Sequence, residues 1–411
     1  MAKIQLMKIG PNMPKAKVAV AQITTLTAYH WDLSIGGDSP LRLSLNRYPE
    51  LYGSADIDGD YEVIRKVLRL DRYRAIAEAI RNCANEYNAV LREEVWAIIR
   101  KAADLDISLS VFPEYSIPGD LIEDIHGKAR KTGVSVVAGS HTVTRNDIDT
   151  HPYRTAIRDR LQDDSWDMIA VAPVLLADNS EPIFVFKQVS SKFEPQLYVG
   201  LSDPDRDVIS VPLRNTSEHF SLALAICAEF VRDPGSWVAA EQIKRSWEHA
   251  DVIAIVSLTP STKPFHDDAL RFMRERRGRI AIAFCNTALR GDSAIMVNDD
   301  RTETIRTLPA HNEGILWREI PVGSGAGERR PLPVPAVNIC RIVVKSKAQQ
   351  QIFLAAEKLN NRDFYGASAE IESMTERLSQ PLKYIKSQIA ERLQYSLEGN
   401  INKRLFAVSR G

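Results

Sequence analysis

The chain has 411 residues, and its 53 Lys and Arg residues balance 53 Asp and Glu, so the formal net charge at pH 7 is zero. That length is enough for one large domain with additions or for two domains. A balanced charge lacks the positive excess that holds a phosphate backbone, so we expect no nucleic acid partner. No stretch approaches 18 consecutive apolar residues and no signal-peptide pattern opens the sequence, so we expect no membrane partner and a cytoplasmic location.

The cysteines and histidines do not form a recognisable ligand set. The four cysteines are widely separated, at Cys83, Cys227, Cys285 and Cys340, and none belongs to a CxxC pair. No HExxH motif occurs among the eight histidines. We therefore expect individual free thiols, no metal and no cofactor.

The first part of the chain combines one strand with a long irregular segment. The apolar run KVAVAQ at 17–22 predicts a buried strand. From about 23 to 73, clusters of Gly, Pro, Ser and Asp predict an inserted and largely irregular segment. Apolar positions at helical spacing over 73–104 then predict one long helix or two in series.

Strand-like and helix-like segments alternate over the next two hundred residues. Strands are predicted at 106–112, 134–138, 168–176, 183–189, 222–227, 252–258, 280–285, 293–297 and 314–320. Helices are predicted in the amphipathic stretch up to 131 and near 236–250 and 267–277. Such alternation is typical of helices packed in layers on β-sheet.

The carboxyl-terminal part has a different composition from the rest. A Gly-rich stretch after residue 321 predicts a linker, 334–344 predicts one more strand, and 348–406 is mainly helical. We therefore expect a main domain at 15–320 with an insertion at about 23–73. The remaining segment, 321–411, would be a linker, a strand and a helical tail that packs on its own domain or on a second subunit of a homodimer or higher homo-oligomer.

Three reactive residues each follow an apolar strand: Glu114, Lys187 and Cys227. Strand ends in α/β layers are where ligands most often bind, because loops converge there on rigid elements. A thiol needs a base to become a thiolate, and the oxyanion that forms after its attack needs a positive donor. Glu114 would be the general base and later acid, Cys227 the nucleophile, and Lys187 with the N–H of Ala228 the oxyanion donors.

Several short motifs resemble those of the nitrilase superfamily of carbon–nitrogen hydrolases. KVAVAQ at 17–22 is similar to the opening strand of that superfamily, VFPEY at 111–115 to the motif of its base glutamate, and ICAEF at 226–230 to its nucleophile turn. The order strand, helix, strand and Asn over 250–286 also follows the superfamily, and the resemblance covers about 15–320.

The resemblance implies an α/β fold in the form of a four-layer αββα sandwich, carrying the insertion and the helical extension. It also implies a thiol hydrolase that cleaves a non-peptide carbon–nitrogen bond through a Cys thioester. We expect a small amide or carbamoyl substrate, with a nitrile less favoured. Two alternatives stay open: an amine-accepting acyltransferase of the same superfamily, and a catalytically inactive scaffold that binds a ligand or partner.

The identity of the catalytic lysine is the open question in this assignment. The superfamily usually has an aromatic-Arg-Lys sequence, whereas this chain has VFKQVSSKFE at 185–194. Lys187 and Lys192 both compete for the role, and we favour Lys187 because its separation from Glu114 and Cys227 fits the superfamily. Glu194 would then stand where a second, supporting glutamate often lies, although a plain loop carboxylate is nearly as good an interpretation.

Overall fold

This computed structural model describes residues 14–24, 91–322 and 338–341, apart from 146–147, 160, 162–165, 167, 179, 191–207, 232–249, 260, 276–279, 289, 298–304 and 311. Several predictions fall outside the described residues. They are nearly all of the expected insertion, residues 73–90 of the helix predicted at 73–104, residues 236–249 of the helix predicted at 236–250, the linker at 323–337, the helical tail, Lys192 and Glu194.

The described strands form two sheets. The first has eight strands in the order β14-β13-β1-β2-β3-β5-β4, with β6 pairing with β5 as well. Their bounds are β1 Lys15–Gln22, β2 Leu109–Val111, β3 Ser135–Val137, β4 His141–Thr144, β5 Met168–Leu175, β6 Ile183–Phe186, β13 Gly314–Pro321 and β14 Asn338–Arg341. The second has six, in the order β12-β11-β10-β9-β8-β7. Their bounds are β7 Ile209–Pro212, β8 His219–Ile226, β9 Val252–Val256, β10 Ala281–Cys285, β11 Ser293–Val297 and β12 Thr307–Leu308.

The two sheets pack face to face because their strands alternate between two buried faces. In β1, Val18 and Val20 join the core between the sheets, whereas Ala19 and Ala21 face the helices that cover the first sheet. The same alternation runs along β8, where Leu222, Leu224 and Ile226 face the first sheet and Ala223 and Ala225 face the opposite way. Each sheet is thus buried on both faces.

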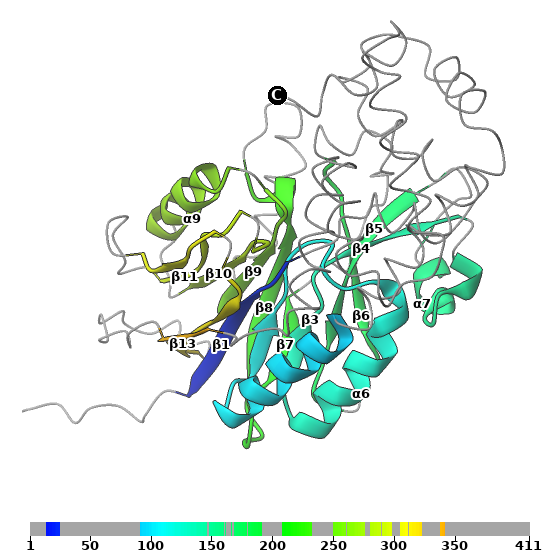
Figure 1. The fold of residues 1–411 in the computed structure, drawn as a ribbon, viewed down its shortest axis with the longest axis horizontal. Helices are drawn as coiled ribbons and strands as arrows, with labels where there is room; N and C mark the ends of the chain where they lie inside the picture. Colours follow the sequence, from blue (N-terminus) through cyan, green and yellow to red (C-terminus); the bar gives the residue numbers. More distant parts are fainter. Residues whose placement is uncertain are drawn as a thin grey trace, which may run out of the picture.

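Helices cover the outer face of each sheet. The first sheet is covered by a helix whose described part is 91–104 and by α6, Ile122–Thr132, which ends at Gly133 in the left-handed conformation. The second sheet is covered by α9, Lys263–Glu275, whose buried side chains recur at helical spacing at Phe265, Ala269, Leu270 and Met273. Figure 1 shows α6 and α9 on opposite sides of the strands. The described residues therefore form the expected αββα sandwich.

The predicted elements are largely confirmed, with differences at their ends. β8 ends at Ile226 and β6 at Phe186, so the reactive residues Cys227 and Lys187 each begin the segment after a strand. β4, β7 and β12 and the short helix α7, Arg154–Arg158, were not predicted, since four residues or so carry too little periodicity. β14 pairs with β13, so the strand expected at 334–344 extends the first sheet. No helix in the described part of the chain is long and apolar enough to cross a membrane.

Strand directions bring several carboxyl ends together. β1, β2 and β3 are parallel, and β6 runs the same way because it is antiparallel to β5, which is antiparallel to β3. In the second sheet β8, β9 and β10 are parallel to one another. Glu114 follows β2, Lys187 follows β6 and Cys227 follows β8, so each lies at a carboxyl end of its sheet. Such ends are where loops converge into sites.

Candidate active site

Glu114 and Lys187 form a buried ion pair. The Lys187 Nζ donates to Glu114 Oε1 across 2.7 Å, and the two side chains are 0% and 2% exposed. Burying either charge alone would be strongly unfavourable, so each partner makes the presence of the other tolerable. The pairing also joins the ends of β2 and β6 within the first sheet. The structure thus brings two of the three predicted catalytic residues into direct contact.

The segment after β9 links this pair to Cys227. The N–H of Leu258 donates to Glu114 Oε2 across 2.9 Å, so both oxygens of the carboxylate are held. One residue earlier, the Ser257 hydroxyl donates to Cys227 Sγ across 3.6 Å. The register of the parallel strands explains this contact: Ile226 of β8 pairs with Val256 of β9, so the next residue of each strand is again a neighbour. Two adjacent residues therefore connect the thiol and the carboxylate.

Cys227 occupies a strained turn. Its φ is 48°, in the left-handed region that L-residues other than Gly, Asn and Asp rarely adopt, and it begins the short 3₁₀ turn Cys227–Glu229. Such a conformation costs on the order of 1–3 kcal/mol and occurs most often at functional sites. The side chain is buried among apolar neighbours, with 8% of the residue exposed. The chain therefore leaves the direction of β8 at Cys227, directly after the strand ends.

A glycine fixes the loop that carries Glu114. Gly139 follows β3 with φ 62°, and a Cβ built there would lie 2.0 Å from the carbonyl oxygen of Pro113 and 2.7 Å from Ser116 Oγ. Only glycine fits so close to that backbone. The neighbouring Ser140 Oγ accepts a hydrogen bond from the N–H of Tyr115, which itself has φ 55°. The loop is therefore held on both sides of Glu114.

Tyr115 also contributes a ring to the surroundings of the lysine. The Lys187 Nζ lies 5.9 Å from the centre of this ring, a cation–π distance. Tyr115 clusters with Met168, Ala170 and Leu258, and it is mostly buried. The ammonium is thus bounded by a carboxylate on one side and an aromatic face on another.

Asn286 braces the ends of β9 and β10. Its amide oxygen accepts from the N–H of Thr259, and its amide nitrogen donates to the carbonyl oxygens of Thr259 and Gly291. All of these contacts lie between 3.0 and 3.1 Å, and Asn286 is fully buried. The amide therefore fixes the segment that carries Ser257 and Leu258.

The sequence named some of these residues and missed others. Glu114, Lys187, Cys227 and Ala228 each lie at or just after the end of a strand, and Lys192 and Glu194 stay predictions. Glu229 was expected only to shape the turn after Cys227, and two residues with contacts at this site had no expected role: Ser257 and Asn286. Ser257 and Asn286 each follow a parallel strand, β9 and β10, so the signal used for the other three would have found them. Its position two residues after Cys227 is the signal for Glu229, whereas its bond to the N–H of Gln188 depends on tertiary structure and has no sequence signal.

A buried histidine pair packs against Gly119, which lies five residues after Glu114. His141 and His151 place their Nε2 atoms 3.0 Å apart, and both lie above Gly119, where a Cβ would be 3.0 Å from His151 Nε2. His151 Nδ1 accepts from the N–H of Tyr153. Burial lowers the pKa of His151 to about 4, and burial and then the charge of His151 lower the pKa of His141 well below its usual value. Both rings are neutral near pH 7, which suits a structural pair.

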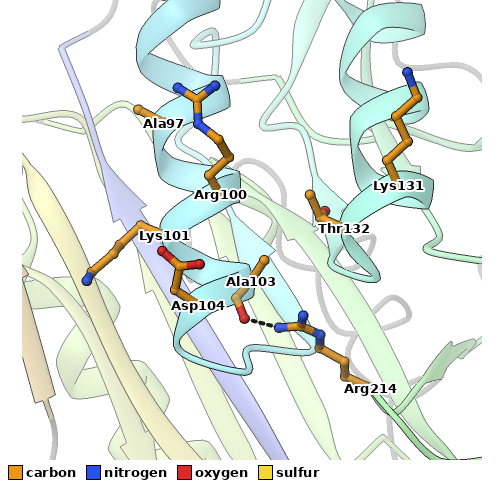
Figure 2. Close-up of a pocket in the computed structure, with 8 residues that line it drawn as sticks. All are labelled: Ala97, Arg100, Lys101, Ala103, Asp104, Lys131, Thr132 and Arg214. Atoms are coloured by element: carbon orange, nitrogen blue, oxygen red, sulfur yellow. Dashed lines mark hydrogen bonds between the residues drawn. The ribbon is translucent and has the colours of Figure 1, made fainter.

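A hollow of about 590 Å³ lies at the end of the strands opposite to Glu114 and Lys187. It is lined by the last turns of the 91–104 helix and α6, and by Arg214 from the turn before β8. Figure 2 shows that Arg100 and Lys131 point outward while Arg214 turns to the carbonyl of Ala103, so the cations do not converge on one point. Cations at helix carboxyl ends complement the helix dipole. Nothing at this hollow indicates a ligand.

Comparisons with known proteins give matches among solved structures. No family model and no curated protein matches the chain. Among solved structures, Nit3 of Saccharomyces cerevisiae, a member of branch 10 of the nitrilase superfamily, is 12% identical, with 75% of this chain and 90% of that one covered at a TM-score of 0.40. An amidase from Nesterenkonia sp. is also 12% identical, covering 74% and 90% at a TM-score of 0.37. A double mutant of that amidase in complex with acrylamide is 10% identical, covering 76% and 93% at 0.38.

These neighbours belong to the superfamily that the sequence motifs resemble. Similarity at 10–12% identity and TM-scores near 0.4 does not assign an activity or a substrate. The site of this chain itself combines a thiol on a strained turn, a carboxylate with both oxygens held, and an ammonium paired with that carboxylate. Groups of these three kinds can act as a nucleophile, a proton acceptor and a donor to an oxyanion. Among the described residues, no group of three or more His, Cys, Asp or Glu side chains is arranged to hold a metal ion.

Proposed function

We propose that the protein is a thiol hydrolase of the nitrilase type that cleaves the carbon–nitrogen bond of a small amide or carbamoyl compound. The observation that carries the proposal is the chain of contacts from Lys187 through Glu114 and the Ser257–Leu258 segment to Cys227. The Cys–Glu–Lys combination provides acyl-transfer chemistry without a histidine. Two contacts of the carboxylate, to an ammonium and to a main-chain N–H, fix its position for that role.

The first half of the reaction forms a thioester. Glu114 accepts the proton of the Cys227 thiol, and the sulfur attacks the carbonyl carbon of the substrate. The oxyanion that develops is stabilised by the Lys187 ammonium and the N–H of Ala228, and one such donor typically contributes about 3–4 kcal/mol to the barrier reduction. Glu114 then gives the proton to the departing nitrogen, so ammonia or an amine leaves and the acyl group stays on Cys227.

The second half returns the enzyme to its starting state. Glu114 removes a proton from water, and the resulting hydroxide attacks the thioester carbon. Collapse of the second tetrahedral intermediate breaks the carbon–sulfur bond, and the proton held by Glu114 passes to sulfur. The products are a carboxylic acid and the free thiol. If an amine replaces water at this stage, the same residues perform an acyl transfer instead.

The cellular compartment and the assembly of the protein are also part of the proposal. Cys227 and Cys285 are free thiols, which suits a reducing compartment such as the cytoplasm. We propose a homodimer or higher homo-oligomer as the assembly, and a small amide as the binding partner. Size-exclusion chromatography with light scattering tests the assembly, and a monomer at micromolar concentration would contradict it.

The activity is tested by incubating the protein with a panel of small amides, carbamoyl compounds and nitriles while ammonia is measured. We expect ammonia from at least one amide, and an acyl group on Cys227 that hydroxylamine removes and mass spectrometry detects. Cys227→Ala should abolish both signals, and Glu114→Gln should lower the rate about 10²–10⁴-fold. Release that survives Cys227→Ala would contradict the mechanism. An inert protein whose Cys227 is no more reactive than Cys285 would favour a binding scaffold.

A further inference from the structure

Glu229, two residues after Cys227, connects the two sheets at the candidate active site. Its Oε2 accepts from the N–H of Ile226 across 2.7 Å, and its Oε1 accepts from the N–H of Gln188 across 2.6 Å. Glu229 is fully buried. Ile226 ends β8 in the second sheet, whereas Gln188 follows β6 of the first sheet by two positions. One carboxylate therefore bonds the main chain of both sheets.

The two donors are the sequence neighbours of two catalytic residues. Ile226 immediately precedes Cys227, and Gln188 immediately follows Lys187. A displacement of either main-chain segment would therefore move the thiol or the ammonium. Catalysis by positioned groups is sensitive to such shifts, and a misplacement of about 1 Å can cost about 10²-fold in rate. The contacts of Glu229 thus bear on the separation between nucleophile and oxyanion donor.

We propose that Glu229 is a positioning residue that holds the Lys187 turn of the first sheet against the Cys227 turn of the second. This inference rests on the proposed function, because it gives Glu229 a purpose in the reaction of Cys227. Both carboxylate oxygens accept from the main chain, which directs Glu229 to positioning rather than to proton transfer with a substrate. Its contacts also stabilise the turn in which Cys227 has φ 48°.

The carboxylate is suited to this position because two N–H donors face it. Glutamine keeps the size of the side chain but supplies one oxygen, and its NH₂ group would meet the second N–H donor to donor. Glu229→Gln therefore breaks one of the two bridges while the side chain still fills its space. Glu218, which is exposed just before β8, offers a matched control for the loss of one negative charge.

The probe is iodoacetamide, and the readout is the alkylation rate at each cysteine, assigned by mass spectrometry. Glu229→Gln should slow alkylation of Cys227 about 10–100-fold, because the displaced ammonium no longer stabilises the thiolate. Cys285, which is fully buried, should stay as slow as in the wild type, and Glu218→Gln should match the wild type at both sites. Faster labelling of Cys285 in Glu229→Gln would assign Glu229 to general stability and overturn the positioning role.

A double variant tests whether Glu229 acts through the lysine. If it does, Lys187→Met combined with Glu229→Gln should alkylate no more slowly than Lys187→Met alone, because both changes remove the same ammonium. Effects that multiply would overturn the proposal. Hydrogen exchange gives a second measure: amides 188 and 226 should exchange faster in Glu229→Gln and unchanged in Glu218→Gln. Unchanged protection at both amides would also overturn it.

Glu114→Gln, measured alongside, separates this inference from the proposed function. Slower alkylation of Cys227 with Glu114→Gln but not with Glu229→Gln would overturn the positioning role and leave the proposed function standing. Alkylation that responds to neither variant would overturn both. A response to both, with Cys285 unchanged, is the result we expect.

Discussion

Cys227 and Cys285 show how one position relative to the end of a strand changes the surroundings of a thiol. Both stand at carboxyl ends of parallel strands in the same sheet, β8 and β10, with β9 between them. Cys285 is the last residue of its strand, and its Sγ donates to the carbonyl of Val111 at 3.2 Å, inside the core. Burial raises the pKa of the Cys285 thiol far above its usual value. Cys227 instead lies one residue beyond its strand.

That single residue changes what the thiol contacts. The left-handed turn takes Cys227 out of the ladder and brings its Sγ to the Ser257 hydroxyl. Ser257 is followed by Leu258, whose N–H holds Glu114. The strand sequences themselves, ALAI before one cysteine and AIAF before the other, hardly differ in character. The geometry after the strand, and the groups brought to it from the first sheet, therefore distinguish the two cysteines.

The largest contrast should come from removing each thiol in turn. Cys227→Ala should lower amide turnover by about 10⁴-fold or more, as expected for loss of a covalent nucleophile. Cys285→Ala should leave turnover essentially unchanged and lower the free energy of unfolding by about 1 kcal/mol, through a small cavity. Turnover is measured as ammonia release and stability by urea unfolding. Equal activity losses in the two variants would contradict the assignment of Cys227 as nucleophile and Cys285 as a core residue.

The buried ion pair of Lys187 and Glu114 should contribute more to stability than an exposed pair of similar geometry. Lys187→Met leaves Glu114 buried without its ammonium, which should cost about 3–5 kcal/mol of unfolding free energy. The control is Lys263→Met, which breaks a 2.6 Å pair with Asp267 whose side chains are 84% and 50% exposed. That change should cost about 0.5 kcal/mol or less. Similar losses for both, by urea unfolding, would contradict the burial argument.

The histidine pair should make the free energy of unfolding fall at acid pH. His151 is neutral when folded because its pKa is lowered to about 4, whereas the unfolded chain binds that proton near pH 6.5. Its contribution to stability is therefore complete above pH 6.5 and lost as the pH falls to 4, by about 3 kcal/mol. His151→Gln should reduce this acid loss, whereas the exposed control His219→Gln should not. Identical pH profiles of all three proteins in urea unfolding would contradict it.

The smallest expected effect comes from two glycines, Gly139 and Gly127, that differ in the space around them. Gly139→Ala should lower the unfolding free energy by more than about 1 kcal/mol and slow alkylation of Cys227, because a Cβ at 2.0 Å from the Pro113 carbonyl must displace the Glu114 loop. Gly127→Ala, in α6, meets nothing within 4 Å and should stabilise the protein by up to about 1 kcal/mol. A Gly139→Ala variant with wild-type stability and labelling would show that the loop has room.

The sequence predicted the strands and the residues of the candidate site better than the contacts between those residues. Apolar runs identified β2, β6 and β8, and a reactive residue after each run identified Glu114, Lys187 and Cys227. Contacts between those residues join segments 73 positions apart along the chain, and no local pattern encodes them. Glu229 shows the limit most clearly, since its two bonds reach Ile226 beside it and Gln188 from the other sheet.

Short strands set the corresponding limit for the fold. β4 and β7 have four residues each, so their apolar positions are too few to separate a strand from a loop. Both gain their place from neighbours, since β4 pairs with β5 and β7 with β8. Longer runs such as β5 and β11 were placed within a residue, because a strand buried on both faces is apolar along its whole length.

The most direct measurement is the rate of iodoacetamide alkylation at Cys227 and Cys285 across pH, in the native protein and in Glu114→Gln. We expect Cys227 to react far faster than Cys285 near neutral pH, and we expect Glu114→Gln to remove most of this advantage while Cys285 stays slow. If the native protein alkylates the two cysteines equally slowly, or if Glu114→Gln leaves Cys227 unchanged, then Cys227 is not a nucleophile activated by Glu114.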